Sequence, residues 1–87
     1  MMDAMQAMAF PNPSQGQLTL QYNSPEKSSY LMKVTDLTGR LLQQETLEAS
    51  EGMNRHAVNL SNVAKGVYML SVEKAGGDKI VIRLVIE

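Results

Sequence analysis

Apolar and polar side chains alternate with a period of two along much of this chain. Six segments carry this alternation: residues 17–22, 30–35, 40–48, 55–60, 67–73 and 79–87, and residues 5–10 would add a short seventh. Because successive side chains of a strand point to opposite faces, this pattern is typical of strands with one buried face. Gly, Pro and Asn separate the segments. The pattern predicts an all-β antiparallel sandwich of six to seven strands.

Three segments leave alternatives open. Residues 40–48 include a polar stretch that would also suit a helix. Ser61 to Lys65 would form one helical turn if Ser61 or Asn62 caps it. The last segment, residues 79–87, is apolar on both faces, which favours a central position in a sheet or a face that still needs a partner.

Length and composition exclude several classes of protein. The chain has 87 residues, enough for one domain with one core. It contains no cysteine, so disulfides and thiolate metal sites are excluded. Its formal net charge is −1 and its basic residues are scattered, which argues against a nucleic-acid partner.

The chain divides into a lead-in, residues 1–9, and one domain, residues 10–87. No apolar stretch approaches the roughly 20 residues that span a bilayer as a helix. Met1 to Met8 include Asp3 and no basic residue, unlike a secretory signal. We therefore expect the chain to be a fragment, with any export signal on a larger precursor.

The sequence contains few residues in arrangements that catalysis requires. The single histidine, His56, is in period with Val58 and Leu60, which suits a structural position. No nucleophile-elbow pattern surrounds any serine, and no carboxylates stand at metal-ligand spacing around His56. The sequence therefore predicts no enzyme, no cofactor and no metal site.

Three short segments have recognisable turn chemistry. Pro11-Asn12-Pro13 reads as a stiff extended segment that leads into a turn at Gly16. Asp36 to Arg40 reads as a tight turn in which Gly39 has a positive φ and Asp36 accepts backbone hydrogen bonds. Gly66-Val67-Tyr68 places a glycine ahead of a strand with an inward-facing tyrosine.

Taken in this order, the segments resemble the type A C-terminal sorting domain of the type IX (Por) secretion system of Bacteroidetes. The resemblance extends over residues 10–87 and includes Gly52-Met53-Asn54 and Asn59-Leu60-Ser61. The motif residues that carry it are Pro11, Asn12, Pro13, Gly16, Asp36, Gly39, Arg40, Gly66, Val67, Tyr68, Lys79, Ile82, Leu84 and Val85.

The resemblance implies an Ig-like β-sandwich that serves as a C-terminal address and is not an enzyme. A covalently linked N-terminal cargo would reach the periplasm, and an outer-membrane type IX translocon would then recognise the folded domain. A sortase-like protease would cut ahead of Pro11 and leave the cargo on the outer-membrane surface or in the extracellular space. We expect the last strand to contact the machinery by edge pairing.

Two other interpretations compete with this one. An Ig-like adhesion or carbohydrate-binding module of a secreted protein would need an exposed aromatic platform, whereas Tyr22, Tyr30 and Tyr68 fit inward-facing strand positions. An isolated fragment would also have the means to form a homodimer through an exposed strand.

Overall fold

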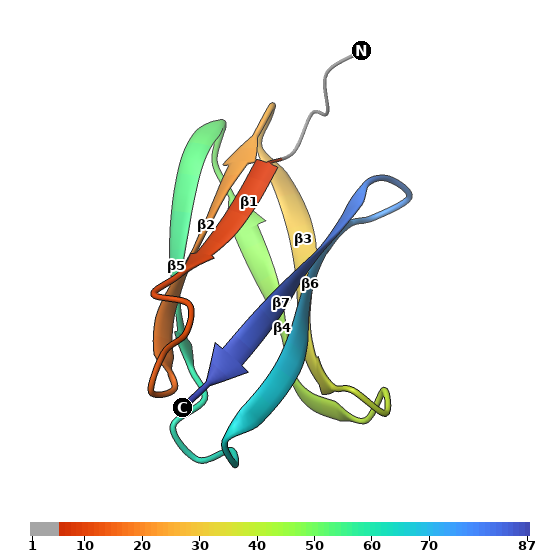
Figure 1. Ribbon diagram of the computed structural model, residues 1–87. Coiled ribbons are helices and arrows are strands. Elements are labelled where there is room, and N and C mark those ends of the chain that lie inside the picture. Colours follow the sequence, from red (N-terminus) through yellow and green to blue (C-terminus); the bar gives the residue numbers. More distant parts are fainter. Residues whose placement is uncertain (1–5) are drawn as a thin grey trace.

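A computed structural model describes residues 6–87, which contain seven strands and no helix (Figure 1). The strands are β1 (Gln6–Phe10), β2 (Gln17–Ser24), β3 (Ser28–Asp36), β4 (Leu41–Ala49), β5 (Gly52–Asn59), β6 (Gly66–Lys74) and β7 (Lys79–Ile86). The predicted all-β fold is confirmed. Both helical alternatives are wrong: residues 41–49 pair with β3 as a strand, and residues 61–65 form turns. The described part of the chain has no helix long and apolar enough to cross a membrane.

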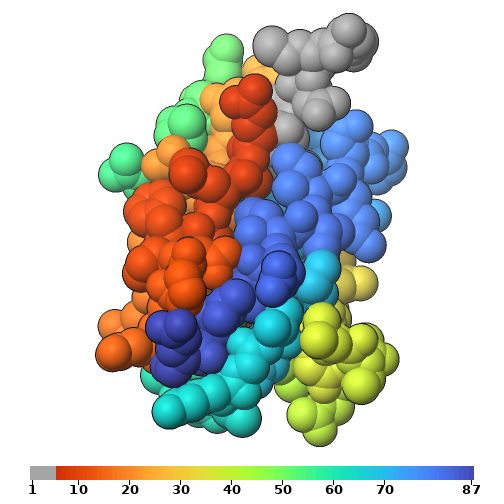
Figure 2. Space-filling model, in the orientation of Figure 1, coloured from red at the N-terminus to blue at the C-terminus, as the bar shows by residue number. Residues whose placement is uncertain are grey.

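The strands form an Ig-like sandwich of two antiparallel sheets, one ordered β1-β2-β5 and the other β4-β3-β6-β7. The chain passes between the sheets three times after β1, at the β2–β3, β4–β5 and β5–β6 connections. Strands β1 and β7 are therefore edge strands, and they lie against each other along one side of the sandwich (Figure 2).

The core lies between the sheets because each strand directs alternate side chains inward. In β2 the buried residues are every second one from Leu18 to Ser24. The three tyrosines are buried as predicted, and the rings of Tyr22 and Tyr30 meet edge to face at 5.5 Å. Met32 is completely buried, which also matches the sequence prediction.

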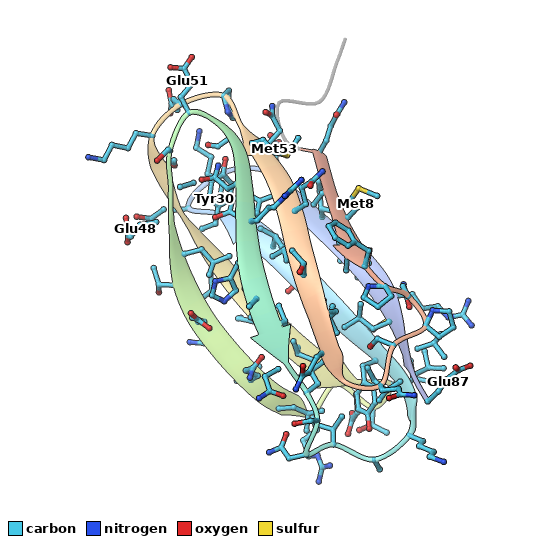
Figure 3. The ribbon with its side chains drawn as sticks, turned by 90° about the vertical axis from the view of Figure 1, so that its left-hand side faces the viewer. Met8, Tyr30, Glu48, Glu51, Met53 and Glu87 are labelled. Atoms are coloured by element: carbon cyan, nitrogen blue, oxygen red, sulfur yellow. The ribbon has the colours of Figure 1, made fainter. Side chains whose placement is uncertain are left out.

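The outer faces carry the polar half of the alternation. Figure 3 views the molecule from the side of the three-stranded sheet, where Met8 and Met53 are exposed large apolar side chains. A hydrogen-bonded row crosses this face, in which Arg55 Nε donates to Gln21 Oε1 at 3.0 Å. Most of the outer face of this sheet therefore suits contact with solvent.

Strand β7 is not central, and the prediction of a central position is wrong. It is the edge strand of the four-stranded sheet and pairs only with β6 among the described strands. Its two apolar faces have a different cause. Leu84 and Ile86 pack into the core, while Val85 lies beside Val67 of β6 on the outer face.

The sandwich has two ends, which we call the motif pole and the far pole. The motif pole consists of the loops at residues 11–16, 37–40 and 60–65 together with the end of β7, and it lies at the bottom of Figure 1. The far pole consists of the loops at residues 25–27, 50–51 and 75–78. Most of the motif residues identified in the sequence lie at the motif pole.

Candidate functional site

Residues 11–14, which we call the strap, lie along the outer edge of β7. The Asn12 side chain donates from Nδ2 to the carbonyl oxygen of Arg83 (2.8 Å) and accepts at Oδ1 from the N–H of Val85 (3.0 Å). The Ser14 backbone N–H donates to the carbonyl oxygen of Val85 (3.0 Å). Its carbonyl oxygen accepts from the N–H of Glu87 (2.8 Å). The strap therefore covers the last part of the β7 edge.

The strap forms the hydrogen bonds that a parallel strand would form with β7. In a parallel ladder, one residue bonds the carbonyl before and the N–H after the residue opposite it. Ser14 does this with its backbone, and it forms a parallel bridge to Ile86. Asn12 does the same with its side-chain amide, opposite Leu84. An asparagine side chain suits this role because it offers a donor and an acceptor together.

Gly16 locks the strap to the β5–β6 connection. Its φ is +110°, and a Cβ at this position would lie 2.7 Å from the Ser61 Cα. The Leu60 N–H donates to the Gly16 carbonyl oxygen, while Asn59 Oδ1 accepts from the Ser61 N–H at 3.0 Å. Only glycine fits here, and the Pro-Asn-Pro…Gly and Asn-Leu-Ser segments form one interlocked unit.

Asp36 organises the β3–β4 turn, as predicted. Its Oδ1 accepts from the backbone N–H of Thr38 (2.9 Å) and of Arg40 (3.0 Å), and from Thr38 Oγ1 (2.6 Å). Arg40 Nε lies 3.3 Å from Asp36 Oδ2. The hydrogen bond from the Thr38 side chain, and then the bond from the Arg40 backbone, lower the pKa of Asp36 below its usual value. Gly39 completes the turn with a φ of +91°.

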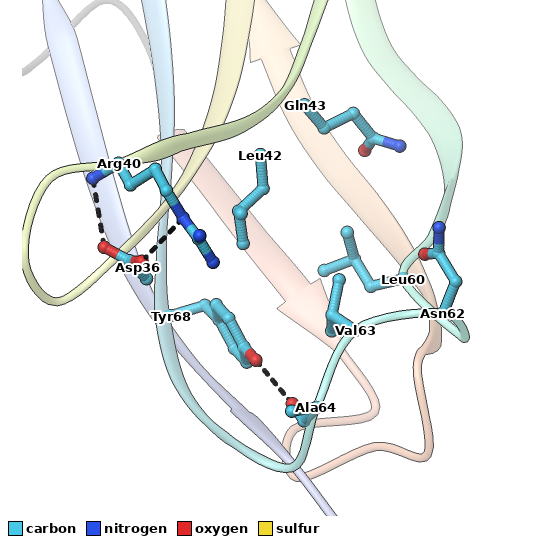
Figure 4. Close-up of a pocket in the computed structure, with 9 residues that line it drawn as sticks. All are labelled: Asp36, Arg40, Leu42, Gln43, Leu60, Asn62, Val63, Ala64 and Tyr68. Atoms are coloured by element: carbon cyan, nitrogen blue, oxygen red, sulfur yellow. Dashed lines mark hydrogen bonds and ion pairs between the residues drawn. The ribbon is translucent and has the colours of Figure 1, made fainter.

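Tyr68 closes the neighbouring corner. Its hydroxyl donates to the Ala64 carbonyl oxygen four residues earlier, the arrangement known as a tyrosine corner in Ig-like sandwiches. Tyr68 also lies opposite Asp36 in the β3–β6 register. The Asp36 turn and the Gly66-Val67-Tyr68 segment therefore meet around a hollow of about 420 Å³, floored by Leu42, Leu60 and Val63 (Figure 4).

The structure gathers most of the predicted site residues and separates two of them, Lys79 and Ile82. The strap residues meet the part of β7 that contains Leu84 and Val85, and Val67 lies opposite Val85. Lys79 is exposed at the other end of β7, opposite Glu73. Ile82 is half-buried and lies along β7 between Lys79 and Leu84. The recognition role of these residues stays a prediction.

Two positions that hold the chain connections carried no strong sequence signal. Ser14 is 6% exposed and anchors the strap, although the sequence around it indicated only a turn. Asn54 clamps the β4–β5 connection by accepting from the Ser50 N–H (3.0 Å) and donating to the Gly52 carbonyl oxygen (3.0 Å). The sequence indicates these roles only by placing asparagine and serine near chain reversals, where such side chains often form hydrogen bonds with nearby backbone.

The polar side chains of the domain serve its architecture. His56 Nε2 lies 3.1 Å from Glu45 Oε1, where β5 and β4 face each other across the side of the sandwich. Within residues 6–87, no three His, Asp or Glu side chains converge as metal ligands would.

The aromatic side chains do not form a carbohydrate platform. Tyr22, Tyr30 and Tyr68 are between 1% and 8% exposed, and Tyr30 Oη lies 2.9 Å from Ser24 Oγ inside the molecule. Phe10 is the only other aromatic residue and is 37% exposed. A single ring at the start of the strap lacks the neighbours that such a platform needs.

Comparison with known families identifies the domain. The family model described as a secretion system C-terminal sorting domain matches residues 8–87, nearly the whole chain. No curated protein matches the chain. Domains of this family are sorting signals and not enzymes; they follow an N-terminal cargo, interact with the secretion machinery and belong to secreted proteins. The chain belongs to the C-terminal sorting domains of the type IX secretion system.

Proposed function

We propose that the outer-membrane type IX translocon recognises this domain at the part of the β7 edge that has no hydrogen-bonded neighbour among residues 6–87. The motif residues at the motif pole hold that edge in place, so they affect recognition indirectly. The partner would add a strand to the four-stranded sheet, with main-chain hydrogen bonds supplying affinity.

The position of β7 is the observation that carries this proposal. The outer edge bonds of Arg83, Val85 and Glu87 go to the strap, so by alternation Lys79 and Val81 also direct their backbone groups outward. Within residues 6–87, no hydrogen bond reaches the outward N–H and C=O of Val81, and its side chain is 50% exposed. Unpaired edge groups of this kind are a template for a partner strand.

We further propose that a sortase-like protease separates cargo from address ahead of β1. Strand β1 begins at Gln6, inside the lead-in expected at residues 1–9, and it pairs with β2 from Gln6 to Phe10. Proteases need an extended and accessible backbone, so paired strand residues make poor substrates. A cut before Gln6 would leave the sandwich whole and would release the cargo to the outer-membrane surface or the extracellular space.

The test replaces single residues of β7. Removing residues 80–87 would delete Leu84 and Ile86 from the core, and lost export would then report unfolding. Val81→Pro instead removes only an outward N–H, which an edge strand tolerates. Val81→Thr is the matched control, because it changes the same exposed side chain and keeps the N–H.

Both variants are fused behind a reporter in a type IX-competent host, and exported and retained reporter are measured. We expect Val81→Pro to lower export at least tenfold, while Val81→Thr stays near the unmodified domain. Circular dichroism of the purified domains verifies that both are folded. Undiminished export of a folded Val81→Pro domain would contradict edge pairing.

A further inference from the structure

The two halves of the strap hold β7 in different ways. Ser14 is buried and uses its backbone, and the adjacent Gly16 is locked against Ser61. Asn12 is exposed and holds β7 through its side chain alone. Release of Asn12 therefore requires rotation of one side chain, whereas release of Ser14 requires the motif pole to open.

The prolines on either side of Asn12 leave the strap unable to extend the sheet. Pro11 and Pro13 have no N–H, so the strap presents few donors to a further strand on its outer side. Natural edges are protected in this way against unwanted pairing. A partner strand consequently has β7 itself as its template, and its path along β7 runs into the Asn12 side chain.

We infer that Asn12 is a displaceable side-chain cap on the docking track of β7. The track runs from Lys79 to Val85, and its partner is an extended polypeptide segment of the secretion machinery. Its strand takes over the bonds to the Arg83 carbonyl and the Val85 N–H, and it ends against Ser14. This inference rests on the proposed edge pairing. It adds that the Asn12 side chain competes with the partner strand for the Arg83 carbonyl and the Val85 N–H.

Substitution of Asn12 tests the competition. Asn12→Ala removes both bonds to β7, and Asn12→Asp keeps an acceptor but loses the donor to the Arg83 carbonyl. Asn54→Ala is the control, since it removes a half-buried asparagine clamp at the far pole and leaves β7 untouched. Comparing melting temperatures of the three variants separates loss of stability from opening of the track.

The first measurement is amide hydrogen exchange of the 87-residue domain by NMR. We expect Asn12→Ala to speed exchange of the Val85 N–H, while the Glu87 N–H stays protected by Ser14. Asn54→Ala should leave both amides unchanged. If Glu87 loses protection together with Val85, the strap opens as one unit and Asn12 is not a separate cap.

The second measurement is competition for export. Two reporters, one with the unmodified domain and one with Asn12→Ala, are expressed together so that they compete for the translocon. We expect the variant to be favoured by up to about thirtyfold, the factor given by the two hydrogen bonds that no longer have to be displaced. Equal or weaker export of Asn12→Ala would overturn the inference. Normal export of Val81→Pro would instead overturn the edge pairing itself, so the two failures are distinguishable.

Discussion

The two poles of the sandwich are closed by different means. The motif pole depends on positions where one residue type fits: Gly16 has no room for a Cβ, and Asn12 uses both halves of its amide. The far pole depends more on contacts between side chains, although Asn54 also uses both halves of its amide there. Lys74 Nζ lies 3.1 Å from Glu26 Oε2, and Ser24 Oγ lies 2.9 Å from Tyr30 Oη.

This difference gives a structural role to the motif identified in the sequence. Its prolines, glycines, aspartate and tyrosine gather at the pole where the first and last segments of the domain meet. Identity matters there because backbone passes close to backbone. At the far pole, the contacts run mainly through side chains, as in the Lys74–Glu26 ion pair and the Asn54 clamp.

The largest effect should come from adding one methyl group at each pole. Gly16→Ala places a Cβ against the Ser61 backbone at a positive φ, and we expect it to lower the free energy of unfolding by about 3 kcal/mol or more. Gly76→Ala at the far pole has a φ of +69° and nothing within 4 Å, so we expect about 1 kcal/mol. Urea denaturation measures both, and equal losses would refute the contrast between the poles.

A smaller effect should follow removal of one hydroxyl at each pole. Tyr68→Phe frees the Ala64 carbonyl from the tyrosine corner, and we expect a loss of about 1.5 kcal/mol. Tyr30→Phe leaves Ser24 bonded to the Glu26 carbonyl, so we expect about 0.5 kcal/mol. Thermal melts of the two variants provide the comparison. A greater loss for Tyr30→Phe would mean that the far pole is the more constrained end.

The smallest effect is a dependence on pH that differs in direction between the poles. The pKa of Asp36 is lowered, so its stabilisation is complete above about pH 4 and is lost as the pH falls through the folded-state pKa. The pKa of Lys74 is raised, chiefly by its hydrogen bond to Glu26. Its stabilisation is therefore complete below about pH 10 and is lost as the pH rises through the folded-state pKa.

Variants of the two residues make this difference measurable. We expect the melting temperature of Asp36→Asn to lie below that of the unmodified domain at neutral pH and to approach it in acid. The gap between Lys74→Gln and the unmodified domain should close in alkali instead. Gaps that do not change with pH would show that neither charge takes part in holding its pole.

The sequence predicted the strands well because period two is a local signal. It also predicted the Asp36 turn, whose bonds all lie within five residues. It did not predict the strap, since Asn12 bonds residues 71 and 73 positions away, and such contacts leave no periodic trace. The sequence left the position of β7 open for a related reason: apolar residues on its outer face pack beside Val67 and look like those of a central strand.

We propose that the translocon recognises the β7 edge while the motif pole holds that edge in place. The most direct measurement compares export of Val81→Pro with export of Tyr68→Phe, each fused to the same reporter and each verified as folded. We predict that Val81→Pro is retained despite its stability, whereas Tyr68→Phe is exported normally despite its lower melting temperature. Normal export of a folded Val81→Pro domain would contradict recognition at the β7 edge, whether or not Tyr68→Phe is retained.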